Sequence, residues 1–73
     1  MNDFIDALKQ QFPDGTVEMT GEGGKFLATV VSEQFAGLSK IARHKLVYKA
    51  LNPYIASGEI HALTIVANTT SEA

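Results

Sequence analysis

Two histidines are the candidate metal ligands of this sequence. His61 precedes an alternating apolar segment and shares one face with Leu63 and Ile65. From the residues alone, both a hydrogen-bonded core histidine and a metal ligand at the margin of a sheet remain open. A neutral imidazole binds a transition metal through one nitrogen, and a single ligand does not hold a metal, so further ligands must come from elsewhere. His44 lies on a predicted helix, and its spacing from His61 matches no zinc pattern, so we interpret it as a surface or interhelix hydrogen-bonding residue.

Four basic residues lie within one ten-residue window that contains no acid: Lys40, Arg43, Lys45 and Lys49. Lys40 and Arg43 are three residues apart, and Lys45 and Lys49 are four apart, so each pair shares a helix face. Such a helix could contact phosphates or an acidic partner surface. A merely solvated helix face is the alternative. Base recognition has little support, because Tyr48 is the one aromatic residue in the window and no base-reading set accompanies it.

Other kinds of chemistry find little support in the sequence. The segment 21–24 (Gly-Glu-Gly-Gly) precedes a predicted strand, whereas a phosphate-binding loop must open a helix, so a hairpin turn is expected. The chain has no cysteine, which excludes disulfides, cysteine-based zinc sites and a thiol nucleophile. The serines lie in no nucleophile-elbow pattern and the carboxylates form no acid–base pair. We therefore expect a protein that is not an enzyme.

Length and composition indicate one small domain, spanning residues 1–73. The chain has 45% hydrophobic and 19% charged residues, which is a globular composition. Its net charge of −2 counts against generic nucleic-acid binding. The apolar runs, such as 26–31, are far shorter than the roughly 20 residues that span a bilayer, and no secretory signal is visible. We expect a cytoplasmic protein that does not contact a membrane.

The residue patterns predict a helix, two strands, a helix, a short second helix and a final strand. An apolar stripe favours the first helix, with Asn2 as its cap. Ser39 is the predicted cap of the second, and Asn52-Pro53 is expected to end it and begin the short one. The expected ranges are 2–12, 16–20, 25–32, 40–51, a turn from Pro53, and 59–67.

The fold class that this order predicts is α+β, with the helices on one face of a three-stranded sheet. The last strand follows a helical crossover, so it should pair in parallel with its neighbour. Alternation within this strand sorts its side chains into two rows. One row is expected to hold His61, Leu63, Ile65 and Ala67, and the other Ile60, Ala62, Thr64 and Val66.

Three sequence motifs together resemble the BolA-like family. Residues 35–48 (FAGLSKIARHKLVY) are similar to its F-x-G signature followed by R-H-[RK]-x-V-[YN]. Residues 30–35 (VVSEQF) resemble its V-S-x-x-F strand, and residues 60–63 (IHAL) resemble its V/I-H-A-L. The motifs occur in the family's order and spacing and cover about Gly21 to Ala67. The short N-terminal stretch is typical of the bacterial, IbaG-like subgroup.

The resemblance implies a class II KH-like fold and a specific kind of partner. BolA-like proteins pair with monothiol glutaredoxins and share a two-iron, two-sulfur (2Fe–2S) cluster with them. The glutaredoxin supplies a cysteine and a bound glutathione thiol, and the BolA-like protein supplies the histidine of H-A-L, which is His61 here. The cellular roles implied are iron–sulfur cluster trafficking, iron homeostasis and stress response.

The loop between the first two strands departs from the family pattern. Relatives often carry Cys or His there, whereas this chain has Glu22 and Lys25, which suit an iron–sulfur cluster poorly. Three alternatives remain: His61 with a weak or exogenous fourth ligand, His44 as a second ligand, or glutaredoxin binding without cluster sharing. The family is also linked to transcriptional regulation, so DNA binding through the basic helix 40–49 is the alternative function. A weak homodimer is a further partner expectation.

Overall fold

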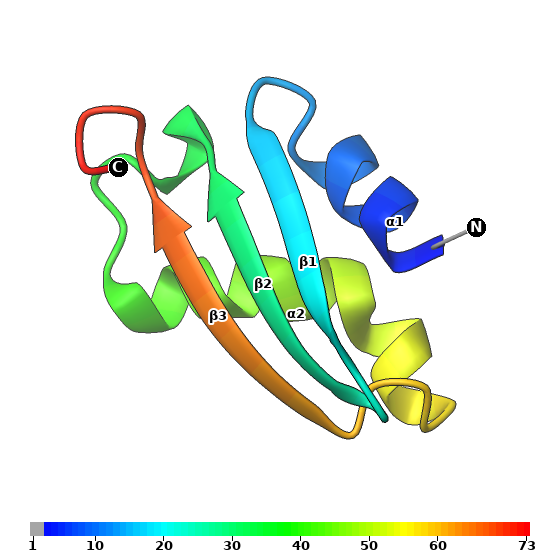
Figure 1. Cartoon of the computed structure of the whole chain (residues 1–73). Coiled ribbons are helices and arrows are strands. Elements are labelled where there is room, and N and C mark those ends of the chain that lie inside the picture. Colours follow the sequence, from blue (N-terminus) through cyan, green and yellow to red (C-terminus); the bar gives the residue numbers. More distant parts are fainter. Residues whose placement is uncertain (1–2) are drawn as a thin grey trace.

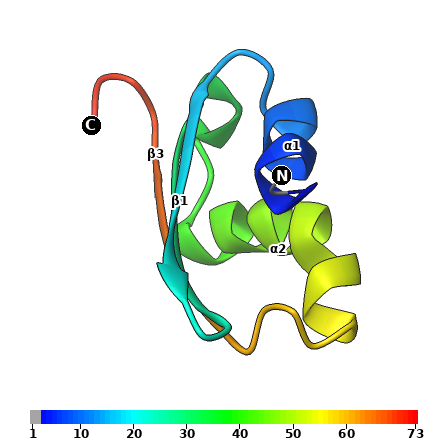
Figure 2. The same cartoon turned by 45° about the vertical axis from the view of Figure 1, so that its right-hand side comes forward.

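The structure, a computed structural model, describes residues 3–73. A three-stranded sheet forms one layer and two helices form the other; Figure 1 shows α2 crossing behind the strands, and Figure 2 shows both helices on the same face of the sheet. This confirms the predicted α+β fold. The elements are α1 (Asp3–Gln11), β1 (Thr16–Glu22), β2 (Lys25–Val31), the 3-10 helix η1 (Glu33–Phe35), α2 (Lys40–Ala56) and β3 (Ala62–Asn68). The predicted cap Asn2 lies outside the described residues.

The sheet order is β1-β2-β3, with an antiparallel pair followed by a parallel one. β1 and β2 are joined by the two-residue turn Gly23-Gly24, whose φ angles of 63° and 81° are both positive. Two residues at positive φ match a type I′ hairpin turn, which glycine adopts without steric cost. The parallel pairing of β2 with β3 confirms the expected helical crossover, because α2 carries the chain between their two ends.

Helix α2 begins as predicted but does not end as predicted. The Ser39 Oγ accepts a hydrogen bond from the Ala42 N–H at 3.2 Å, which confirms the N-cap. The expected break at Asn52-Pro53 is wrong, because α2 continues through Pro53 to Ala56 with no separate short helix. Packing explains the difference. Leu51 is fully buried on one side of the proline, and Tyr54 meets the Phe4 ring edge-on at 5.3 Å on the other, which offsets the lost backbone hydrogen bond.

The core lies between the sheet and the helices. Phe12 and Phe35 are buried with their rings 5.1 Å apart, at the end where the polypeptide leaves α1 and β2. In β3 the predicted row of Leu63, Ile65 and Ala67 packs against this core, as expected. The other buried residues of the core are Leu8, Ala28, Val30, Val47, Leu51 and Ile60.

Ile60 departs from the predicted alternation. It was expected in one row with Ala62, Thr64 and Val66, which are exposed, but it is 3% exposed. The reason is that β3 begins at Ala62, later than predicted, so strand alternation does not govern residue 60. Instead, the Ile60 N–H donates to the Tyr54 carbonyl at 3.1 Å, which holds this residue at the end of α2.

Candidate functional site

His61 lies exposed at the start of β3, beside the β1–β2 hairpin turn. Its backbone N–H donates to the Gly24 carbonyl at 2.7 Å, and the Ala62 N–H donates to the same oxygen at 3.1 Å. Within residues 3–73, no side-chain hydrogen bond involves the imidazole ring. The backbone is therefore fixed while the ring nitrogens stay accessible, so His61 is not a sealed core residue.

The hairpin residues Glu22 and Lys25 pair directly with each other on either side of the turn. Lys25 belongs to the outward row of β2 with Leu27, whereas Phe26 packs on the core. His61 precedes the helix-facing row that contains Leu63. Because neighbouring residues of a strand point to opposite faces, the sheet separates the side chains of Glu22 and Lys25 from the helix-facing side. No cluster of three potential metal-binding side chains occurs in the described part of the chain.

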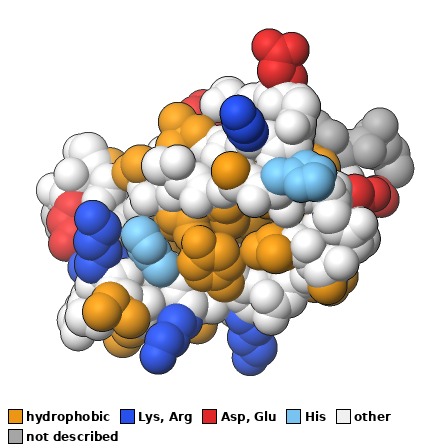
Figure 3. All heavy atoms as spheres, turned by 90° about the horizontal axis from the view of Figure 1, so that it is seen from below, with side chains coloured by type: hydrophobic (Ala, Val, Ile, Leu, Met, Phe, Trp, Pro, Cys, Tyr) orange, Lys and Arg blue, Asp and Glu red, His pale blue; other side chains and the backbone are white. Residues whose placement is uncertain are grey.

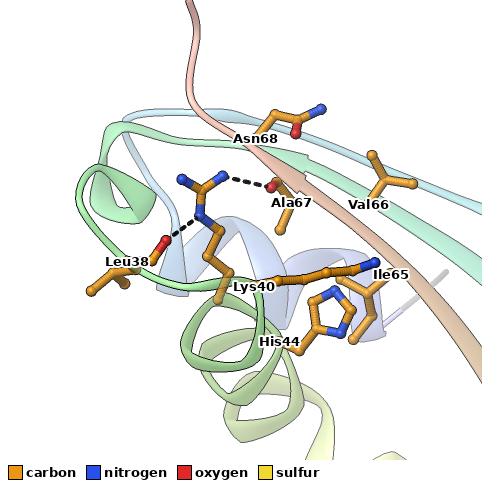
Figure 4. Close-up of a pocket in the computed structure, with 8 residues that line it drawn as sticks. Leu38, Lys40, His44, Ile65, Val66, Ala67 and Asn68 are labelled. Atoms are coloured by element: carbon orange, nitrogen blue, oxygen red, sulfur yellow. Dashed lines mark hydrogen bonds between the residues drawn. The ribbon is translucent and has the colours of Figure 1, made fainter. Parts of the chain in front are cut away.

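His44 lies in an open hollow of about 400 Å³ between α2 and the second half of β3, from Ile65 to Asn68. Figure 4 shows its imidazole beside the Lys40 side chain and near Ile65. His61 precedes Ile65 by four residues, which is roughly 13 Å along a strand. The structure therefore does not place His44 where it could share a metal with His61. The full lining of the hollow is Leu38, Lys40, Arg43, His44, Ile65, Val66, Ala67 and Asn68.

Arg43 is held by contacts within the chain. Its Nε donates to the Leu38 carbonyl at 3.0 Å and its Nη1 to the Ala67 carbonyl at 3.1 Å; the two dashed lines in Figure 4 end at these two carbonyls. Its guanidinium also forms two hydrogen bonds with the Glu72 carboxylate, and its side chain is 14% exposed. Arg43 was expected, with three lysines, to contact a partner or nucleic acid, whereas its guanidinium bonds α2 to the preceding loop, to β3 and to the C-terminal turn.

The Arg43–Glu72 pair changes the acidity of both groups. The hydrogen bonds from Arg43, followed by one from the Thr69 N–H at 2.7 Å, lower the pKa of Glu72 to about 2. The Glu72 carboxylate in turn raises the pKa of Arg43. Glu72 therefore stays ionised well into the acidic range, and the turn formed by residues 69–73 stays joined to α2.

Comparison with known proteins identifies the family. The family profile described as "BolA-like protein" matches residues 6–72. The chain belongs to the BolA-like family. It is 48% identical to a protein of the rpoN–murA intergenic region of Acinetobacter guillouiae, over 94% of this chain and 83% of the relative. It is 39% identical to the acid stress protein IbaG of Escherichia coli strain K12, over 77% of this chain and 67% of that protein.

Two further comparisons concern a regulator and a solved structure. This BolA-like chain is 50% identical to the DNA-binding transcriptional regulator BolA of Vibrio cholerae, over 71% of this chain and 48% of that protein, so the match spans about half of the regulator. Its fold superimposes on the BolA domain of SufE1 from Arabidopsis thaliana with a TM-score of 0.85, at 29% identity, covering 97% of this chain and 92% of that one. The BolA fold and the IbaG-like bacterial relationship are thus shown.

The exposed side of α2 combines lysines with apolar side chains. In this BolA-like chain Lys40, Lys45 and Lys49 are exposed, and so are Ile41 at 70% and Tyr48 at 40%. Figure 3 shows both histidines on one face of the molecule, with hydrophobic side chains between them and basic side chains around them. None of the three lysines forms a salt bridge within residues 3–73, where Arg43–Glu72 is the one ion pair found.

The part of the BolA-like chain from residue 3 to residue 73 contains no helix that combines the length and the apolar character needed to cross a membrane.

Two features of the site were not predicted from the sequence. The first is the contact of His61 with Gly24, which are far apart in sequence; the Gly-Gly pair is the one sequence feature that points to it. The second is the ion pair between Arg43 and Glu72, which no sequence pattern indicates.

Proposed function

We propose that this BolA-like protein is a non-enzymatic adaptor that pairs with a monothiol glutaredoxin and shares a bridging 2Fe–2S cluster through His61. The observation that carries the proposal is the exposed imidazole of His61 on a backbone anchored to the hairpin. An exposed neutral imidazole can offer one nitrogen to iron, and a fixed backbone limits the positions that the ring can occupy. The cellular role proposed is cluster trafficking and iron homeostasis under stress.

The donor set of the chain fits one half of a shared site. A 2Fe–2S cluster takes four protein-type ligands, mostly thiolates, with histidine replacing cysteine in some clusters. The chain has no cysteine, and His44 lies in the hollow beside Ile65 to Asn68, away from the hairpin turn to which His61 is bonded. We therefore assign the remaining ligands to the partner, as its cysteine and a glutathione thiol, with an exogenous fourth ligand where His61 is the one residue from this side. Glu22 and Lys25 belong to the outward side of the hairpin and would not bind the cluster.

The face that carries both histidines has the composition of a protein interface. Its hydrophobic side chains lie between the histidines and its basic side chains lie around them (Figure 3). A protein interface commonly has an apolar centre and a polar rim. Lys40, Lys45 and Lys49 are exposed and could form charge-assisted hydrogen bonds with carboxylates of the glutaredoxin or of glutathione. Arg43 is already paired, so the lysines carry this role.

The test is to add the protein to a cluster-loaded monothiol glutaredoxin and to follow visible absorption and circular dichroism. The wild type should change the spectrum as a thiolate ligand is replaced by imidazole, and His61→Ala should abolish the change. His44→Ala is the matched control on the same face, and it should still produce the spectral change. A wild type that leaves the spectrum unchanged would exclude cluster sharing. A His61→Ala variant that acts as wild type would exclude His61 as the ligand.

DNA binding is the second candidate function. The observation that favours it is the set of three exposed lysines on α2, a helix without an acidic residue, in a chain similar to a regulator described as DNA-binding. Two observations weigh against it: Arg43 is occupied by Glu72, and the net charge is −2. The exposed Ile41 and Tyr48 also suit a protein partner better than phosphates.

A further inference from the structure

We infer that Gly24 is the positioning residue for His61: the missing side chain at residue 24 creates the space in which the imidazole lies. The inference deepens the proposed function and rests on it for its consequence, since His61 is the proposed cluster ligand. The position of the His61 ring relative to Gly24 is a property of the free protein, so it can be measured without any cluster.

The contact between the two residues is close. A Cβ built at Gly24 would lie 2.3 Å from the His61 Cδ2, 3.1 Å from its Cγ and 3.4 Å from its Cβ. A separation of 2.3 Å between carbons is far inside the 3.5–4.0 Å of van der Waals contact. Any side chain at residue 24 must therefore displace the ring.

The orientation of the ring matters for its chemistry. The three atoms of His61 nearest to the added Cβ are all carbons. The hairpin therefore contacts the carbon edge of the imidazole, so that neither nitrogen is the atom pressed on the turn. A ring held in this way keeps its nitrogens for a partner, which is what a shared metal site requires.

Hydrogen bonds hold the backbone at Gly24 and at the start of β3, so this backbone does not shift readily to relieve a clash with the ring. The Gly24 carbonyl accepts hydrogen bonds from the N–H groups of His61 and Ala62, at 2.7 and 3.1 Å. Lys25, the next residue, is aligned with Ala62 where β2 and β3 start to pair. These contacts hold the turn and the start of β3 together. In the described part of the chain, the exposed His61 side chain has no such hydrogen bonds, so it is the part that shifts when residue 24 gains a Cβ.

Gly23 provides a matched control, because it also has a positive φ of 63° but nothing within 4 Å of an added Cβ. Asparagine is the suitable replacement, since it tolerates this backbone region better than other non-glycine residues. We expect Gly24→Asn to shift the NMR signals of the His61 ring and to leave those of His44 in place. Gly23→Asn should leave both histidines unchanged. Unchanged His61 signals in Gly24→Asn would overturn the inference.

A second measurement applies even if Gly24→Asn folds poorly. In the wild-type protein, the His61 Hδ2 proton should show a nuclear Overhauser effect to the Gly24 α-protons, and its absence would overturn the inference. With the cluster-loaded glutaredoxin, Gly24→Asn should weaken complex formation by about tenfold or more, as is usual for residues that orient a metal ligand, while Gly23→Asn stays within about twofold of wild type. Equal weakening by both variants would contradict the positioning role.

The outcomes also separate this inference from the proposed function. If the wild type does not alter the cluster spectrum but the His61 ring moves in Gly24→Asn, cluster sharing fails and the positioning role of Gly24 holds. If the wild type shares the cluster but the ring signals do not respond to Gly24→Asn, the proposed function holds and the positioning role fails.

Discussion

The Arg43 guanidinium and the Glu72 carboxylate face each other through two hydrogen bonds, Nη1 to Oε1 at 2.7 Å and Nη2 to Oε2 at 3.1 Å. Two further N–H groups of Arg43 donate to the carbonyls of Leu38 and Ala67. One side chain of α2 therefore joins the loop before the helix, the end of β3 and the C-terminal turn. A basic residue in the middle of the family signature thus stabilises the fold, and the neighbouring lysines remain for partners.

The first prediction concerns the pH dependence of stability. The pKa of Glu72 is lowered to about 2 in the folded protein from an ordinary value of 4.5. A lowered pKa means that the carboxylate stabilises the fold fully above pH 4.5 and loses this contribution as the pH falls towards 2. Glu72→Gln should therefore lower the urea midpoint at pH 7 and approach the wild type near pH 2. Glu59→Gln, at an exposed position, is the control. A difference between wild type and Glu72→Gln that persists unchanged at pH 2 would contradict the assignment.

The second prediction concerns a buried hydroxyl. Ser32 is 1% exposed; its Oγ donates to the Asp14 carboxylate at 2.9 Å and accepts from the Gln34 N–H at 3.1 Å. Ser32→Ala leaves the Gln34 N–H without this partner, so the free energy of unfolding should fall by about 1–3 kcal/mol. Chemical denaturation measures the loss, and Thr70→Ala, at an exposed position, should stay within about 0.5 kcal/mol. Equal stability of Ser32→Ala and wild type would show that the hydroxyl is dispensable.

Asp14 gives a related expectation. Hydrogen bonds from Gln34 and Ser32 lower its pKa. The carboxylate therefore contributes to stability above its ordinary pKa of about 4, and this contribution declines as the pH falls through the lowered value. NMR titration of the Asp14 side chain should show a lower pKa in the wild type than in Ser32→Ala. An identical pKa in both proteins would exclude the Ser32 hydroxyl as a cause.

The third prediction concerns the proline within α2. Pro53 interrupts the backbone hydrogen bonds of a helix that continues to Ala56. Proline in a helix interior costs about 3 kcal/mol, part of which is offset because proline also restricts the unfolded chain. Pro53→Ala should therefore raise the free energy of unfolding by about 1–2 kcal/mol with the helix content preserved. Thermal unfolding monitored by circular dichroism tests this, and a loss of stability would show that the proline conformation is itself required.

The fourth prediction separates the lysines from Arg43 in DNA binding. If α2 contacts phosphates, replacing Lys45 and Lys49 together with glutamine should reduce the slope of log affinity against log salt by about 2, in duplex DNA titrations. Arg43→Gln should change stability more than this slope, because Arg43 is bonded internally. A wild type that forms no complex with duplex DNA at low salt would remove this function.

Local pattern determined much of the fold. The Ser39 cap, the presence of a glycine hairpin turn and the alternation from Leu63 to Ala67 depend on neighbours within a few residues, so the sequence indicates them directly. The length of the turn was predicted wrongly: it was expected over residues 21–24, but β1 continues to Glu22 and the turn has two residues. The end of α2 was predicted wrongly because the packing of Leu51 and Tyr54 overrides the local preference of proline. Ile60 was misplaced for a similar reason, since its position depends on the hydrogen bond to Tyr54.

The motifs of the sequence by themselves determined the family and singled out His61 as its candidate ligand. Only the tertiary structure decided that the His61 imidazole is exposed against Gly24, that Glu22 and Lys25 belong to the outward side of the hairpin, and that Arg43 is bonded to Glu72. The physical reason is the range of the interactions. Capping, turns and alternation are set by adjacent residues, whereas these contacts join segments that meet only when the sheet and helices pack together.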